Sequence, residues 1–266
     1  MKHIEFIGLP GSGKTTFAKE CFAILRAQGN SAHSTYGVRG KAMRNVLQQE
    51  SGWSWRLLRL AAVFWEYRAI SVLWEKNRCS TIMRFIGKHP ELSRRVIECA
   101  EHTRPPAWIP QEIVCPTNLI DWFFDMVSYY QTAQEVLTSD DIFLQEEGPC
   151  QHAYYLLAFY DGVFDAKRLE SYLDAVPAPD LLIAFLTAPE LCEQRMHHRQ
   201  KGVASDILTP LTVQQRLSVL EERLTGYRKI ADYLERRGVA VLRIENRDHD
   251  TTRREIREGL AVFQAA

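Results

Sequence analysis

The chain has 266 residues, 46% of them hydrophobic, so it can bury the core of one large α/β domain. Its 33 basic and 33 acidic residues leave a formal net charge of zero, which gives no argument for a nucleic acid or a membrane as the main partner. The six cysteines are scattered, without C-x-x-C pairs or zinc-site spacing, and an apolar strand pattern starts almost at Met1. We therefore expect free thiols, no secretory signal and a cytoplasmic protein.

The first strong pattern is a strand, a glycine-rich loop and a helix, in that order. Residues 4–7 form a short apolar run typical of a buried strand, and residues 16–26 have the pattern of a helix. Between them, residues 8–15 have the sequence GLPGSGKT, which fills every fixed position of the phosphate-binding pattern G-x-x-x-x-G-K-[ST]. A second strand is expected over 31–38, after a turn at Gly29 and Asn30.

The residue types in this loop explain why it predicts a phosphate site. Glycines allow backbone conformations in which successive N–H groups converge on phosphate oxygens at the positively polarised start of a helix. Lys14 adds a full charge for the β and γ phosphates, and the Thr15 hydroxyl is a ligand for Mg²⁺. The residues expected to contact the nucleotide are Gly8, Pro10, Gly11, Ser12, Gly13, Lys14, Thr15 and Thr16. The alternative is a glycine-rich turn that matches the pattern by chance.

A long helical region is expected after the second strand. From residue 40 to about residue 138, apolar residues recur with a helical period. The hydrophobic stretch 53–74 is interrupted by charged residues, so we expect an amphipathic helix there and not a membrane span. The prolines of 104–110 should break the helical run, and another helix should begin at 116–118. We expect one domain over 1–266, in which 40–138 is a helical insert that forms the acceptor or lid region.

Three further strands are expected in the second half of the chain. They cover residues 140–145, 181–186 and 239–244, and a long helix over 212–237 precedes the last of them. Strands separated by helices predict an α/β fold with a parallel sheet of about five strands covered by helices. In such a sheet, ligands bind at the carboxyl ends of the strands.

Acidic and basic residues follow two of these strands and are the candidate catalytic groups. Glu146 and Glu147 end the strand over 140–145, where a carboxylate could hold Mg²⁺ or accept a proton from an attacking hydroxyl. Arg195 and Arg199 are four residues apart on the helix after the next strand, so they share one helix face and could neutralise transferred phosphate. The alternatives are a solvated acidic turn and an ordinary basic helix end.

Together, the segments GLPGSGKTT, FLQEEG, PDLLIAFLTAP, CEQRMHHRQKG and VLRIEN resemble the nucleoside and nucleotide kinase group of P-loop proteins, especially its thymidylate-kinase-like members. The resemblance covers roughly residues 1–38 and 138–264. It implies the P-loop NTPase fold, with an acceptor bound between the phosphate loop and the inserted helices. By that likeness Lys14 binds the transferred phosphate, Thr15 holds magnesium, and Arg195 and Arg199 are lid arginines. Either Glu146 or Glu147 belongs to the metal or base position, with Glu146 named as the candidate metal ligand and the choice between the two left open.

Two departures from that group leave the acceptor open. The Asp-Arg dipeptide that thymidylate kinases place after a strand is replaced here by Glu146-Glu147-Gly148. The end of the second strand also lacks the acid-plus-arginine signature of deoxynucleoside kinases. The choice between ATP and GTP is open as well, and the resemblance makes a homodimer one option.

The sequence therefore predicts a kinase that uses ATP and Mg²⁺ to phosphorylate a small molecule, with a nucleoside or nucleotide as the first acceptor class. The main alternative is a P-loop NTPase switch that hydrolyses ATP without a small-molecule acceptor. A sulfotransferase is a weaker alternative, because the intact Gly-Lys-Thr and a metal-binding acid argue against it. A polynucleotide end kinase would require a basic groove, which the neutral charge does not indicate.

Overall fold

The computed structural model of the protein describes residues 1–49, 74–75, 77–102, 104, 115–158, 165–198, 208–209 and 211–265. Its centre is a sheet of five parallel strands in the order β2-β3-β1-β4-β5. The strands are β1 Lys2–Gly8, β2 Ser31–Ser34, β3 Asp141–Gln145, β4 Leu181–Phe185 and β5 Ala240–Ile244. The expectation of an α/β fold with a five-stranded parallel sheet covered by helices is confirmed.

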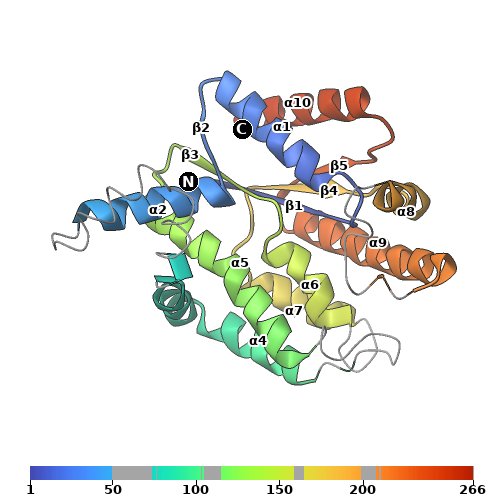
Figure 1. Cartoon of the computed structure of the whole chain (residues 1–266), viewed down its shortest axis with the longest axis horizontal. Coiled ribbons are helices and arrows are strands. Elements are labelled where there is room, and N and C mark those ends of the chain that lie inside the picture. The colour runs from blue at the N-terminus through green and yellow to red at the C-terminus, as the bar shows by residue number, and fades with distance from the viewer. Residues whose placement is uncertain are drawn as a thin grey trace.

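Helices cover both faces of this sheet (Figure 1). They are α1 Lys14–Ala27, α2 Thr35–Gln49, α4 Pro90–Glu101, α5 Pro116–Val136, α6 Pro149–Ala158, α7 Ala166–Ala175, α8 Pro189–His197, α9 Val213–Arg236 and α10 His249–Ala265. Helices α1 and α10 lie together on one face, whereas α5, α6 and α9 lie on the other. Helix α8 sits beyond the end of β4, beside the loop that joins β1 to α1.

The sequence of β1 shows why this strand occupies the middle of the sheet. Ile4 and Phe6 are buried in the core with α1 and α10, and Ile7 is buried in the separate core beneath α5, α6 and α9. Both faces of the strand are therefore covered, which is why its residues form a nearly continuous apolar run. His3 and Glu5 interrupt that run although both are buried.

Most element boundaries follow from local signals in the sequence. Thr212 caps α9 in a reciprocal capping box with Gln215, and Pro189 occupies the first turn of α8. The expected strand over 31–38 is wrong beyond Ser34, because the Ser34 hydroxyl accepts a hydrogen bond from the Gly37 amide at 3.2 Å. This contact turns the chain into α2, so the helical region begins before residue 40.

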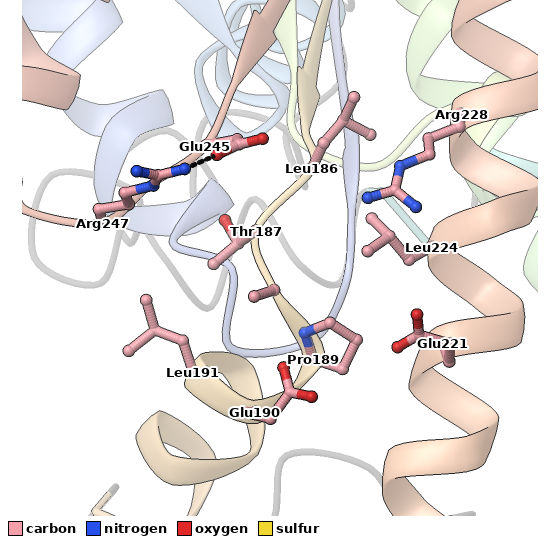
Figure 2. Close-up of a pocket in the computed structure, with 11 residues that line it drawn as sticks. Leu186, Thr187, Pro189, Glu190, Leu191, Glu221, Leu224, Arg228, Glu245 and Arg247 are labelled. Carbon is pink, nitrogen blue, oxygen red and sulfur yellow. Dashed lines mark hydrogen bonds and ion pairs between the residues drawn. The ribbon is translucent and has the colours of Figure 1, made fainter.

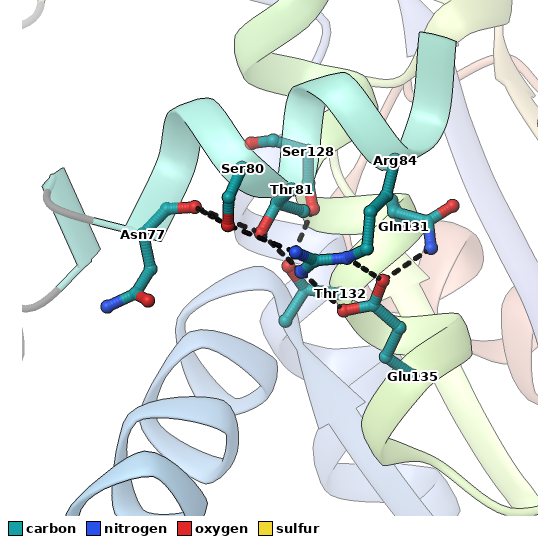
Figure 3. Close-up of polar contacts among 8 residues, drawn as sticks. All are labelled: Asn77, Ser80, Thr81, Arg84, Ser128, Gln131, Thr132 and Glu135. Carbon is teal, nitrogen blue, oxygen red and sulfur yellow. Dashed lines mark hydrogen bonds and ion pairs between the residues drawn. The ribbon is translucent and has the colours of Figure 1, made fainter. Parts of the chain in front are cut away.

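The helical region between β2 and β3 contains α2, α4, α5 and a helical stretch over 77–88. Polar side chains join that stretch to α5 (Figure 3): Arg84 donates to both carboxylate oxygens of Glu135 at 2.7 and 2.9 Å, and Gln131 donates to the same carboxylate at 2.6 Å. Of the helix expected over 53–74, only the end at Trp74 falls within the described residues. Of the expected break over 104–110, only Arg104 does.

Two expectations about the chain as a whole can also be compared with the structure. The six cysteines are free thiols, as expected. None of the described helices has both the length and the apolar character needed to cross a bilayer.

Candidate functional site

Chain segments from four strands meet at the carboxyl edge of the sheet. Because the strands are parallel, the segments that follow β1, β3, β4 and β5 all leave the same edge. They are the glycine-rich loop 8–13, the acidic turn 146–148, Leu186–Thr187, and Glu245–Asn246. β1 pairs with both β3 and β4, so the glycine-rich loop lies between the acidic turn and Thr187.

The glycine-rich loop delivers the open end of a helix to this edge. Helix α1 begins at Lys14, directly after Gly13, whose φ of 101° lies in the left-handed region that favours glycine. The N-cap residue Gly13 has no side chain that could cap this end of α1, and the first turn of the helix contains no acidic residue. The positively polarised start of α1 therefore lies next to a lysine, and this is the chemistry that binds an anion.

Side chains that follow β4 and β5 hold the loop in place. Asn246, just after β5, donates from Nδ2 to the Ser12 carbonyl at 2.8 Å, and the Thr187 hydroxyl donates to the same carbonyl at 3.5 Å. A Cβ at Gly11 would lie 2.5 Å from the carbonyl oxygen of Cys192 on α8, so only glycine fits there. The loop is thus held against two strands and α8 before any ligand binds.

Lys14 lies across the inside of the loop. Its Nζ donates to the carbonyls of Gly8 at 2.7 Å and Leu9 at 3.2 Å, and its side chain is only 7% exposed. Glu147 Oε1 lies 3.9 Å from Nζ, on a side chain that is 58% exposed. Two of the candidate catalytic residues, Lys14 and Glu147, therefore face each other at the mouth of the loop.

Thr15 and Glu146 are in direct contact. The Thr15 hydroxyl donates to Glu146 Oε1, which joins the first turn of α1 to the acidic turn after β3. Hydroxyl and carboxylate oxygens are the donors that Mg²⁺ prefers, and Mg²⁺ is commonly held by one or two protein groups together with water and substrate phosphates. No cluster of three or more His, Cys, Asp or Glu suited to a metal is found in the described part of the chain. The Thr15–Glu146 pair fits such a shared Mg²⁺ site.

The structure describes only one of the two candidate lid arginines. Arg195 lies on α8 and donates from Nη2 to the backbone carbonyl of Arg247 at 3.4 Å, while its buried Nη1 finds no acceptor among the described residues. Arg195 is therefore held at the carboxyl edge, where α8 contacts Gly11. Arg199 lies outside the described residues.

A cavity of about 280 Å³ opens beside the loop (Figure 2). Thr187, which anchors Ser12, lines one side of it together with Arg247. Glu221 and Arg228 of α9 line the opposite side. Thr187 thus connects the cavity to the glycine-rich loop, and the cavity is lined by charged groups of both signs.

The sequence did not point to three residues that build this edge: Glu5, Gln151 and Asn246. Glu5 on β1 is fully buried, and burial raises the pKa of its carboxyl from 4.5 to about 7, although backbone N–H groups that donate to it act in the opposite direction. Gln151 and Asn246 contact the loop through their amides. A charged residue inside an otherwise apolar strand, and a polar residue directly after a strand, were the signals that could have revealed Glu5 and Asn246.

Comparisons with known proteins do not identify a family or a function for this chain. The sequence matches no model of a protein family. It also has no significant match among curated proteins. Function must therefore be inferred from the residues at the carboxyl edge.

Proposed function

We propose that the protein is an ATP- and Mg²⁺-dependent kinase with the P-loop NTPase fold, and that it phosphorylates a small molecule. Nucleosides and nucleotides are the first acceptor class to test. One observation carries the proposal: Lys14 and the Thr15–Glu146 pair converge at the start of α1. Positive charge, the positively polarised start of a helix and metal-binding oxygens at one point are what a nucleotide phosphate chain requires.

In this proposal the loop binds the β and γ phosphates of ATP. Lys14 Nζ exchanges the Gly8 and Leu9 carbonyls, which it contacts at 2.7 and 3.2 Å, for phosphate oxygens. Thr15 and Glu146 would hold Mg²⁺. When bound, Mg²⁺ supplies positive charge that offsets the charge of the phosphate oxygens.

The two glutamates of the acidic turn then have different roles. Glu146 contacts Thr15 and belongs to the metal position, whereas Glu147 faces Lys14 and is open to solvent. Glu147 orients the acceptor hydroxyl and takes its proton while the acceptor oxygen forms a bond to the γ phosphorus. The bond between that phosphorus and the bridging oxygen of ADP breaks in the same step. Arg195, held beside the loop on α8, offsets charge on the transferred group.

The helical region between β2 and β3 is the proposed acceptor-binding part. Helix α6, which follows the acidic turn directly, contacts α5 of that region, since His152 Nε2 lies 3.2 Å from the Leu119 carbonyl oxygen. An acceptor bound next to Glu147 would therefore lie beside these helices, whose side chains would select which molecule binds.

Nucleotide binding to the Lys14→Ala variant tests the proposal. Loss of the Nζ charge should weaken binding of ATP with Mg²⁺ by at least about tenfold in isothermal titration calorimetry. The matched control is Lys19→Ala, because Lys19 is an exposed lysine on the same helix and its loss should leave the Kd unchanged. Equal Kd values for wild type and Lys14→Ala would contradict the proposal.

A further inference from the structure

The buried carboxyl of Glu5 holds the amino end of α6. Its Oε1 accepts hydrogen bonds from the backbone N–H groups of Cys150 at 2.7 Å and Gln151 at 3.0 Å. These donors belong to the first turn of the helix, where backbone N–H groups have no partner inside the helix. The acidic turn packs closely against the same group, because a Cβ at Gly148 would lie 2.6 Å from the Glu5 carboxyl carbon. Glu5 thus contacts both the end of the acidic turn and the start of α6.

Gln151 in turn connects α6 to the glycine-rich loop. Its Oε1 accepts from the Gly8 N–H at 2.9 Å, and its Nε2 donates to the Gly8 carbonyl at 3.3 Å. Nε2 also donates to the Tyr227 hydroxyl of α9 at 2.6 Å, and the side chain is 1% exposed. A buried amide that bonds both backbone groups of one residue holds the two peptide units on either side of that residue in place. Gly8 is also the residue whose carbonyl accepts from Lys14.

We propose that Glu5 and Gln151 are positioning residues that lock the acidic turn and the glycine-rich loop into one rigid unit, so that Glu146 and Glu147 stay in register with Lys14 and Thr15. This inference rests on the proposed function, because it explains how that site keeps its geometry. Neither residue touches the reacting atoms in this account. Glu5 acts through the backbone of α6, and Gln151 acts through the backbone of Gly8.

The Gln151→Leu variant separates positioning from simple stability. Leucine is close in size but removes every hydrogen bond to Gly8, so amide hydrogen exchange over residues 8–13 should become faster, measured by mass spectrometry. Under conditions where circular dichroism shows the variant fully folded, kcat for ATP turnover should fall by about tenfold or more. Tyr227→Phe keeps the bonds to Gly8 and removes one anchor of Nε2, so it should give a smaller change in the same direction and serves if Gln151→Leu does not fold.

A buried glutamine elsewhere provides the matched control. Gln131 on α5 is also fully buried and donates to Glu135, within the polar network of the helical region (Figure 3). Gln131→Leu should lower the melting temperature without changing exchange over residues 8–13 or the Kd for ATP. For Glu5, the conservative variant Glu5→Gln retains an acceptor for both α6 amides and should restore the exchange protection and turnover that Glu5→Leu loses.

Each outcome decides between the alternatives. If amide hydrogen exchange over residues 8–13 is unchanged in Gln151→Leu, the inference is wrong, whether or not the protein binds ATP. Faster exchange with unchanged kcat per folded molecule would also overturn it, because the contact would then serve stability alone. If wild-type protein fails to bind ATP, the proposed function fails, and the exchange data still show whether Gln151 holds Gly8.

Discussion

At the scale of single residues, the structure separates two neighbouring acids that the sequence left equivalent. Glu146 contacts the Thr15 hydroxyl, and Glu147 lies 3.9 Å from Lys14 Nζ. The chain bends at both residues after β3 ends, and the two side chains have different partners. The roles of the two acids should therefore be separable by mutation.

Glu146→Gln should raise the Mg²⁺ concentration needed for half-maximal ATP turnover by about tenfold or more, because a metal-binding oxygen loses its charge. Glu147→Gln should lower kcat at saturating Mg²⁺ while the Mg²⁺ dependence stays close to that of wild type. Both effects can be measured by titrating Mg²⁺ at fixed ATP. A shift in Mg²⁺ dependence for Glu147→Gln alone would reverse the assignment.

Glu5 makes stability depend on pH in a defined direction. Its folded-state pKa is raised from 4.5 to about 7, so the folded protein keeps a proton that the unfolded chain has lost. The contribution of Glu5 to the free energy of unfolding is fully present below about pH 4.5 and is lost as the pH rises through about 7. The total loss is roughly 3 kcal/mol. Glu5→Gln cannot ionise, so its stability relative to wild type should increase from pH 5.5 to pH 8.

Urea unfolding of both proteins at several pH values measures this difference. Comparing the two proteins removes the contributions of His3 and His152, whose pKa values burial lowers to about 4 and whose stability contribution is lost as pH falls from about 6.5 towards 4. Cys150 and Tyr172 also lie near Glu5, and burial raises the pKa of both groups further above neutrality. A difference between Glu5→Gln and wild type that is constant with pH would contradict an elevated pKa at Glu5.

At the scale of secondary structure elements, a buried ion pair fastens α8 to α9. Arg216 Nε donates to Glu193 Oε1 at 2.7 Å, and both side chains are less than a tenth exposed. His197 joins them, with Nε2 2.9 Å from Arg216 Nη2. Since α8 also carries Arg195 and contacts Gly11, this pair supports one side of the proposed site.

Arg216→Met should destabilise the protein by roughly 3 kcal/mol, because it leaves the Glu193 carboxylate buried without its charge partner. The double variant Glu193→Leu with Arg216→Met should recover much of that loss. Arg236→Ala is the comparison, since the Arg236–Glu170 pair is exposed and its loss should cost less than about 1 kcal/mol. Equal losses for Arg216→Met and Arg236→Ala in urea unfolding would show that the buried pair has no special role.

Elements were predictable where local chemistry decides them. The proline starts of α5 and α8, the capping box of α9 and the apolar runs of β3 and β4 each act within a few residues of sequence. The end of β2 was not predicted, because one serine hydroxyl decides between a longer strand and a helix start. Apolar residues continue past Ser34 in either case, so their pattern could not distinguish the two.

At the scale of the whole molecule, strand order decides which residues meet. β1 lies between β3 and β4, and this places the acidic turn on one side of the glycine-rich loop and Thr187 on the other. The sequence predicted the strands and their parallel direction. It did not predict their order, because three of the four strand pairings join residues more than a hundred positions apart. For the same reason the contacts of Glu5 and Gln151 were beyond the local pattern that revealed Lys14 and Thr15.

The central claim is that this edge transfers a phosphoryl group, and ³¹P NMR tests it most directly. Wild-type protein would be incubated with ATP, Mg²⁺ and a mixed pool of nucleosides, nucleotides, sugars and amino alcohols, beside Lys14→Ala and Lys19→Ala. We predict a new phosphate ester or phosphoanhydride resonance that forms with wild type and Lys19→Ala and is absent with Lys14→Ala. Lys14-dependent release of inorganic phosphate with no new phosphorylated species would contradict the claim and indicate an NTPase switch instead.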